Sequence, residues 1–103
     1  MGFDGTEGGA ISLSAAAALT KEHRTRNPGE RTCHFFGRDI LEEILNQEGC
    51  MGIRMYYGVD SDTGNRELVL VGADAEGDDI LDLVADFSKS CPMNCSSANV
   101  LNS

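Results

Sequence analysis

The sequence has no tryptophan, and only six of its 103 residues are aromatic. Leu, Ile, Val and Ala must therefore fill the core, and a small aliphatic core is marginal without a metal, a disulfide or a neighbouring subunit. No run of eighteen apolar residues occurs, so no transmembrane helix is expected. Residues 1–7 lack a basic segment, and the apolar run at 15–19 is too short for a signal peptide. We expect a cytoplasmic protein, with release by lysis or by a dedicated machine as the alternative.

Basic residues are scarce, and the formal net charge is −9. This charge argues against binding to nucleic acid or to an anionic membrane through net electrostatic attraction. Residues 1–38 have five basic and four acidic residues, whereas residues 39–103 have three basic and thirteen acidic residues. A basic N-terminal face could therefore dock on an acidic C-terminal face of another copy, and the alternative is an ordinary soluble acidic surface. The docking residues would be Lys21, Arg24 and Arg26 against Asp74, Glu76, Asp78 and Asp79.

Two helices are predicted in the N-terminal half. Residues 1–10 carry four glycines and are expected to form a flexible arm. Ser12 or Ser14 is suited to cap a first helix, which runs to about Arg26 and is ended by Asn27-Pro28-Gly29.

The second helix has the stronger pattern. Asp39 as N-cap, with Glu42 three residues later, forms a start like a capping box, and Gly49 ends the helix. Its apolar stripe consists of Ile40, Leu41, Ile44 and Leu45.

After Gly49 the pattern changes to a period of two, which predicts strands. Residues 51–59 fit a strand with one buried face, and a turn at 60–65 leads to a buried strand at 68–71. Gly52 and Gly58 leave a flat surface for another backbone, or else mark bulges.

Residues 80–87 fit both a helix and a strand, and we favour a short turn of helix that passes into a third strand. The predicted fold is α+β, with two N-terminal helices followed by a small antiparallel β-hairpin or meander. It forms a single domain over residues 11–95, with 96–103 as a polar tail.

The four cysteines are compatible with three chemical states. In the first, Cys91-x₃-Cys95 has the spacing of a zinc-ligand pair, and Cys50 and His34 could complete a Cys₃His site for a structural zinc ion. Cys33 would then be spare, because adjacent residues seldom both bind one ion. In the second state a disulfide forms, either Cys91–Cys95 or a bridge to Cys50, and in the third the cysteines are buried free thiols.

No catalytic motif is present, so we assign no catalytic residue and expect a protein that is not an enzyme. The side chains of Cys33 and His34 diverge in an extended segment, and the glycines form neither G-x-G-x-x-G nor a P-loop. Asp60-x-Asp62-x-Gly64 suggests a calcium loop, but a hairpin turn explains the same residues.

Four short motifs of this chain are distinctive. These are Phe3-Asp4-Gly5-Thr6, His34-Phe35-Phe36-Gly37, Gly49-Cys50-Met51-Gly52-Ile53-Arg54, and Cys91-Pro92 with Cys95. With them the chain resembles, over nearly its whole length, small uncharacterised bacterial proteins that come mostly from Bacteroidota. The resemblance implies a self-contained single domain and brings no activity or catalytic residue.

The sequence favours a small non-enzymatic structural or interaction protein that self-associates into a homo-oligomer or an open polymer. A second hypothesis is an acidic inhibitor or immunity-type protein that binds a basic protein through residues 60–86. A third is an enzyme built on the thiols.

Overall fold

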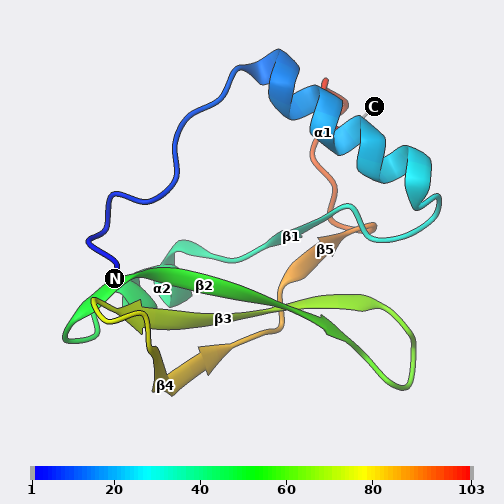
Figure 1. Ribbon diagram of the computed structural model, residues 1–103. Helices are drawn as coiled ribbons and strands as arrows, with labels where there is room; N and C mark the ends of the chain where they lie inside the picture. Colours follow the sequence, from blue (N-terminus) through cyan, green and yellow to red (C-terminus); the bar gives the residue numbers. More distant parts are fainter. Residues whose placement is uncertain (1, 103) are drawn as a thin grey trace. The chain divides into compact units, whose positions relative to one another are not determined.

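The structure is a computed structural model that describes residues 2–102. The chain divides into two compact units, one made of Phe36–Ser88 with residues 2–8 and the other of Gly9–Phe35 with residues 89–102. In chain order the elements (Figure 1) are α1 (Leu13–Arg26), β1 (Cys33–Phe35), α2 (Arg38–Leu45), β2 (Cys50–Val59), β3 (Arg66–Asp74), β4 (Asp79–Ala85) and β5 (Lys89–Cys91).

The first unit is a three-stranded antiparallel sheet with α2 packed on it. The strand order is β2-β3-β4, so β3 is central and the other two strands are edges (Figure 1). Leu70 on β3 pairs with Met55 on β2 and with Ala85 on β4. Ile44 of α2 packs with Leu70 and Ala85 to form the buried core. Partly buried apolar residues surround this core: Phe36, Ile40, Leu41, Cys50, Ile53 and Leu83.

The second unit contains α1 and a two-stranded antiparallel ribbon of β1 and β5. Ser12 caps α1, because its Oγ accepts a hydrogen bond from the backbone N–H of Ala15 at 3.0 Å. No residue of α1 is buried. A polar contact links the helix to the C-terminal segment: Arg24 Nη1 donates to the carbonyl oxygen of Leu101 at 2.6 Å. The predicted capping serine and the predicted end of the helix at Arg26 are confirmed.

The predicted order of elements is wrong, although the chain as a whole is α+β. Strand β1 separates the two helices, and it pairs with β5 near the other end of the chain, so there are two antiparallel sheets. A strand of three residues is too short to show a period of two, and its partner lies far away in sequence. The predicted limits 1–10, 11–95 and 96–103 stay predictions.

Three local predictions also need correction. Residues 79–85 form strand β4, and none of them is helical. Asp39 is not the N-cap of α2, since the helix begins at Arg38 after Gly37 and has no side-chain cap. The face of β2 predicted to be buried is largely exposed beyond Ile53, with Tyr57 93% exposed.

Neither α1 nor α2 is long and apolar enough to cross a lipid bilayer.

Candidate functional site

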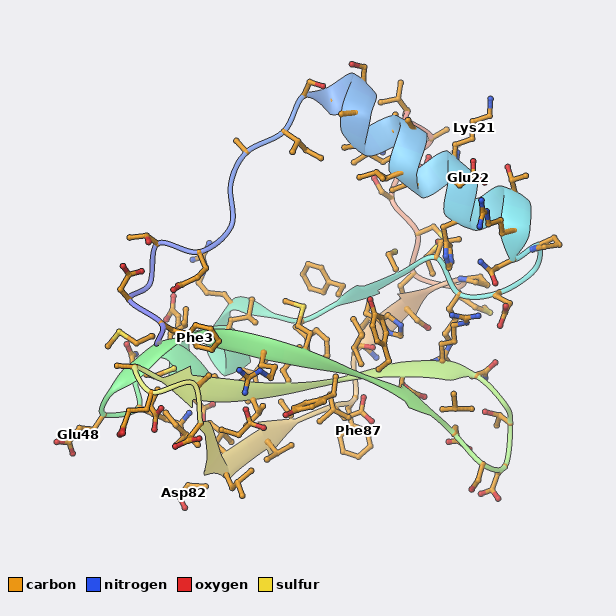
Figure 2. All side chains as sticks on the ribbon, viewed as in Figure 1. Phe3, Lys21, Glu22, Glu48, Asp82 and Phe87 are labelled. Carbon is orange, nitrogen blue, oxygen red and sulfur yellow. A yellow bond between two sulfur atoms is a disulfide. The ribbon has the colours of Figure 1, made fainter. Side chains whose placement is uncertain are left out.

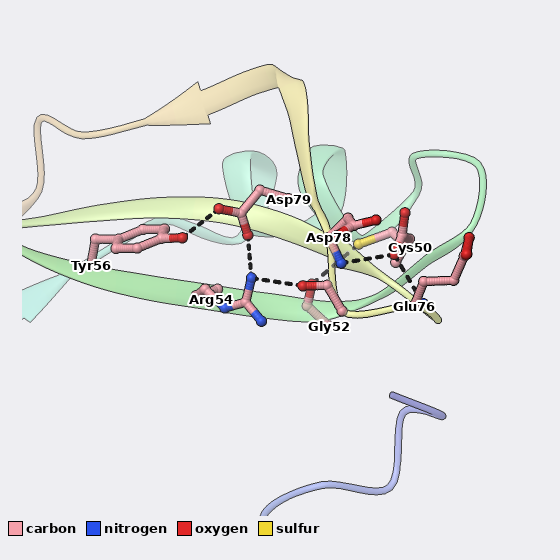
Figure 3. Close-up of polar contacts among 9 residues, drawn as sticks. Cys50, Gly52, Arg54, Tyr56, Glu76, Asp78 and Asp79 are labelled. Carbon is pink, nitrogen blue, oxygen red and sulfur yellow. Dashed lines mark hydrogen bonds and ion pairs between the residues drawn. The ribbon is translucent and has the colours of Figure 1, made fainter. Parts of the chain in front are cut away.

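A polar cluster lies on one face of the first unit's sheet. Arg54 and Tyr56 are two residues apart on β2, so their side chains point to the same face. Asp79, the first residue of β4, lies between them: one carboxylate oxygen accepts from Arg54 Nη1 and the other from the Tyr56 hydroxyl (Figure 3). Arg54 Nη1 also donates to the carbonyl oxygen of Gly77 at 3.0 Å. The cluster therefore joins the edge strands β2 and β4 across β3.

The N-terminal segment completes the cluster. The guanidinium carbon of Arg54 lies 5.3 Å from the centre of the Phe3 ring, which is a cation–π contact. The backbone N–H of Phe3 donates to the carbonyl oxygen of Ala75 at 2.8 Å. Only glycine fits beside it, because a Cβ on Gly2 would lie 1.9 Å from the same oxygen. Residues 2 and 3 are thus held against the β3–β4 turn.

The hydrogen bonds of this cluster shift three pKa values. The bond from Tyr56, and then the bond and charge of Arg54, hold the pKa of Asp79 below its ordinary value, against the opposing effect of burial. The bond to the Asp79 carboxylate raises the pKa of Tyr56, since only the protonated phenol can donate it. The same carboxylate raises the pKa of Arg54. At neutral pH the cluster therefore holds an ionised acid, a neutral phenol and a cation.

Next to the cluster lies a groove of about 430 Å³. Its walls include Phe3, Gly5, Glu7, Leu45, Met51 and Arg54. The groove combines aliphatic walls with one acid and one cation. Arg54 Nη1 is already occupied by Asp79 and Gly77. The arrangement is suited to fastening the N-terminal segment to the sheet.

We predict that the Tyr56–Asp79 bond makes stability depend on pH in two windows. The Asp79 contribution is present above its unfolded pKa of about 3.8 and is lost as pH falls through the lower folded value. The Tyr56 contribution is present below about pH 10 and is lost as pH rises through the higher folded value. The difference in urea midpoint between wild type and Tyr56→Phe, followed by circular dichroism, should be constant between these limits and shrink outside them.

Tyr57→Phe is the matched control for this prediction. Its ring is 93% exposed on the same strand, so its midpoint difference from wild type should stay near zero at every pH. A Tyr56→Phe difference that does not vary with pH would show that the bond to Asp79 does not form in solution.

Of the four residues predicted to bind zinc, His34, Cys91 and Cys95 belong to the second unit and Cys50 to the first. Cys91 and Cys95 form a disulfide, as in the second of the three predicted states, and neither sulfur of this bond is a thiolate that could bind zinc. Cys50 belongs to the first unit, where its thiol donates to the carbonyl oxygen of Gly52 at 3.2 Å. His34 lies on β1 opposite Ser90. Within residues 2–102, no three His, Cys, Asp or Glu side chains form a cluster that could hold a metal ion. Zinc binding stays a prediction for the reduced chain.

The predicted docking cations all lie on α1. Lys21 and Glu22 are exposed on this helix (Figure 2). Arg26 forms an ion pair with Glu22 at 2.6 Å, and Arg24 contacts the carbonyl oxygen of Leu101.

The predicted docking acids lie in the β3–β4 turn and at the two strand ends beside it, and two of them have internal roles. One Asp74 carboxylate oxygen accepts from the backbone N–H groups of Glu76 and Asp78, both at 3.0 Å. Asp79 belongs to the polar cluster. The side chains of Glu76 and Asp78 are left at the surface.

Sequence reasoning missed the polar cluster and the position of Cys33. The spacing of Arg54 and Tyr56 already put both on one strand face, but their link to Asp79 depends on the register of three strands.

Comparisons with protein-family models, with curated proteins and with solved structures gave no match to this chain. The resemblance to a bacterial family therefore stays a prediction.

Proposed function

We propose that this chain is a small non-enzymatic protein that self-associates through the open edge of β2. The observation that carries the proposal is the stretch from Met55 to Val59, which lies on a sheet edge and has no charged residue. Unpaired strand edges pair readily with other strands, and proteins usually protect them with charges or proline. The exposed fractions on this stretch are 58% for Met55, 93% for Tyr57 and 70% for Val59.

The partner that fits this edge is a second copy of the chain. Two β2 strands that pair antiparallel about a two-fold axis at Tyr57 would extend the sheet from three strands to six. The pairing would set Arg54 of one copy opposite Asp60 of the other, at both ends of the shared ladder. It would also bring the exposed Tyr57 rings together and remove them from water, which favours association.

The N-terminal segment limits the pairing to this part of β2. A Cβ on Gly5 would lie 3.5 Å from the carbonyl oxygen of Met51, so the N-terminal segment at Gly5 lies against the beginning of the strand. The second half of β2, from Met55 to Val59, is the half that has no charged side chain. The proposed contact is therefore a short ladder, supported by apolar side chains.

Substitution of Tyr57 by Lys tests this proposal. Tyr57→Lys places two ammonium groups opposite each other at the two-fold axis, so the dimer should dissociate. The folded monomer should be little affected, because the Tyr57 ring is 93% exposed. Size-exclusion chromatography with light scattering should give a mass above that of the 11.0 kDa chain for wild type and the monomer mass for the variant.

Phe87→Lys is the matched control, since Phe87 is 97% exposed and lies after the end of β4 (Figure 2). It should keep the mass of wild type. A wild-type protein that is monomeric at every concentration would refute self-association altogether. An assembly that survives Tyr57→Lys with intact circular dichroism would refute only the β2 contact.

Salt concentration separates the β2 contact from the predicted charge docking. Contacts between exposed charges weaken as the Debye length falls, whereas a backbone ladder with apolar side chains does not. Charge docking would depend mainly on Lys21, Glu76 and Asp78, because the remaining predicted residues already have contacts within the chain. An assembly that dissociates at high salt would support charge docking instead.

A specific observation also supports the hypothesis of an acidic inhibitor. Exposed acids are dense from the β3–β4 turn to the residue that follows β4: Glu76, Asp78, Asp82 and Asp86. Such a surface attracts a basic protein and speeds the encounter. A monomeric wild type whose mass rises only when a basic protein is added would favour this function over self-association.

A further inference from the structure

The second unit places a free thiol beside a disulfide. Cys33 on β1 and Cys91 on β5 are direct partners in the antiparallel register, and Cys91 is bonded to Cys95. Cys33 is a free and exposed cysteine. The sequence analysis treated Cys33 as the spare cysteine of a zinc site that includes His34, because adjacent residues seldom both bind one ion. Its position opposite Cys91 depends on a strand pairing between distant segments.

Direct cross-strand partners have the geometry that a disulfide needs. Their side chains point to the same face of the ribbon, with Cβ atoms about 4.5–5.5 Å apart. Disulfides span Cα separations of about 4.4–6.8 Å, and opposed residues of antiparallel strands lie about 4.5–5.5 Å apart between Cα atoms. A bond between Cys33 and Cys91 therefore needs little movement of the backbone.

A cavity is independent evidence that Cys33 and Cys91 lie on the same face of the β1–β5 ribbon. A pocket of about 340 Å³ in the second unit is lined by both Cys33 and Cys91. Thr20 and His23 of α1 also line it, together with Thr32. The free thiol and one sulfur of the disulfide therefore border the same pocket.

We propose that Cys33, Cys91 and Cys95 form a thiol–disulfide exchange site. The Cys33 thiolate attacks Sγ of Cys91, a Cys33–Cys91 bond forms, and the Cys91–Cys95 bond breaks. Cys95 leaves as a thiolate and takes up the proton that Cys33 lost, so the step needs no oxidant or reductant. The disulfide moves from the C-terminal loop to the β1–β5 ribbon.

The exchange changes which thiol faces solvent. Before exchange the exposed free thiol is that of Cys33, and after exchange it is that of Cys95, which is also exposed, whereas Cys91 is bonded in both states and is 8% exposed. After exchange the exposed Cys95 thiol can form a mixed disulfide with small disulfides or with cysteines of other proteins. The class of substrate is therefore thiols and disulfides. This site is separate from the β2 edge and does not depend on self-association.

Trypsin digestion distinguishes the two disulfides. Cleavage after Arg31 and Arg38 releases Cys33 in the peptide 32–38, whereas cleavage after Lys89 leaves Cys91 and Cys95 together in the peptide 90–103. A Cys33–Cys91 bond therefore joins two peptides, and a Cys91–Cys95 bond joins none. Protein held without oxygen at pH 8 and high dilution, then trapped with N-ethylmaleimide, should give the joined pair with the label on Cys95.

Three variants complete the test. Cys33→Ser should lose the joined pair and keep both Cys91 and Cys95 unlabelled, with unchanged circular dichroism. Cys95→Ser, oxidised with diamide, should convert mainly to the Cys33–Cys91 bond, and Cys50→Ser should behave as wild type.

The proposal is overturned if, after hours, N-ethylmaleimide labels only Cys33 and Cys50 in the wild-type protein. It is also overturned if the Cys33–Cys91 bond is found only between two copies of the chain. If Cys50 forms a disulfide with Cys91 as readily as Cys33 does, the exchange is not selective for Cys33, and this result would also overturn the proposal.

Discussion

Replacing Ile44 by Ala should lower the free energy of unfolding by about 2–5 kcal/mol, because the change removes three carbon atoms from a fully buried site. Ile44 is 0% exposed and packs against Leu70 and Ala85, which come from the central strand and an edge strand of the sheet. The variant leaves a cavity at the point where α2 meets the sheet. Proteins of this size have a total stability of about 5–15 kcal/mol, so this loss is a large share of the total.

Urea unfolding followed by tyrosine fluorescence measures this loss of stability, because the tyrosines report on the sheet that α2 covers. Both tyrosines lie on β2, and the chain has no tryptophan to mask their signal. Leu45→Ala is the matched control, because it removes a similar side chain from the same helix at a site that is 48% exposed. Its cost should be about 1 kcal/mol. Equal losses in both variants would show that the core is not centred on Ile44.

The part of the fold that could be predicted from the sequence is the part with a regular local pattern. The spacing of Ile40, Leu41 and Ile44 predicted α2, and these three residues do face the sheet. The alternation after Gly49 predicted β2, and the turn formers at 60–65 predicted the hairpin. In that turn, the N–H of Gly64 donates to the carbonyl oxygen of Asp60 at 2.8 Å.

The parts that could not be predicted depend on contacts between distant segments. The Cys33–Cys91 register joins β1 to β5, and neither three-residue strand has a pattern of its own. For residues 80–87 the apolar positions fit two periods, and only pairing with β3 decides for a strand. The link between Arg54 and Asp79 depends on both the β2–β3 register and the β3–β4 register, so the sequence pattern does not predict the candidate polar site as one cluster.

Exposure of β2 was wrongly predicted for a related reason. Alternation shows that Ile53, Met55 and Tyr57 share a face, but not how far a covering helix extends along it. Helix α2 has only eight residues, and it packs near Ile53. The apolar residues beyond it stay exposed. The same pattern that predicts a buried face therefore marks the surface proposed for a second copy.

Gly72 is a second position where a small change should have a large effect. It lies on the central strand β3, opposite Ile53 on one side and Ile80 on the other. A Cβ at this position would lie 2.9 Å from Cys50 Sγ, 2.9 Å from Gln47 Nε2 and 3.3 Å from Ile44 Cγ2. The first two distances are shorter than a side chain tolerates, so the side chains of Cys50 and Gln47 must move, and Ile44 of α2 must shift slightly. We expect Gly72→Ala to cost about 1–3 kcal/mol through overpacking.

Two other glycines of the sheet provide the controls. A Cβ at Gly52 would meet nothing within 4 Å, and one at Gly58 would meet only Glu67, at 3.8 Å and 3.9 Å. Alanine at either position should therefore be neutral or should stabilise the protein by up to about 1 kcal/mol, since it restricts the unfolded chain. Equal effects at all three positions would show that the loss at Gly72 is a general property of strand glycines.

Removing the obstructing sulfur should restore part of the stability that Gly72→Ala loses. Cys50→Ala deletes one of the two atoms that lie closest to the new methyl group, so the double variant Cys50→Ala/Gly72→Ala should be more stable than the sum of the single effects predicts. For residues in contact, such coupling is about 0.5–3 kcal/mol. The urea midpoints of the four proteins in this cycle measure it. Additive single effects would mean that the methyl group is accommodated without displacing Cys50, and hence that this sulfur does not lie against Gly72 in solution.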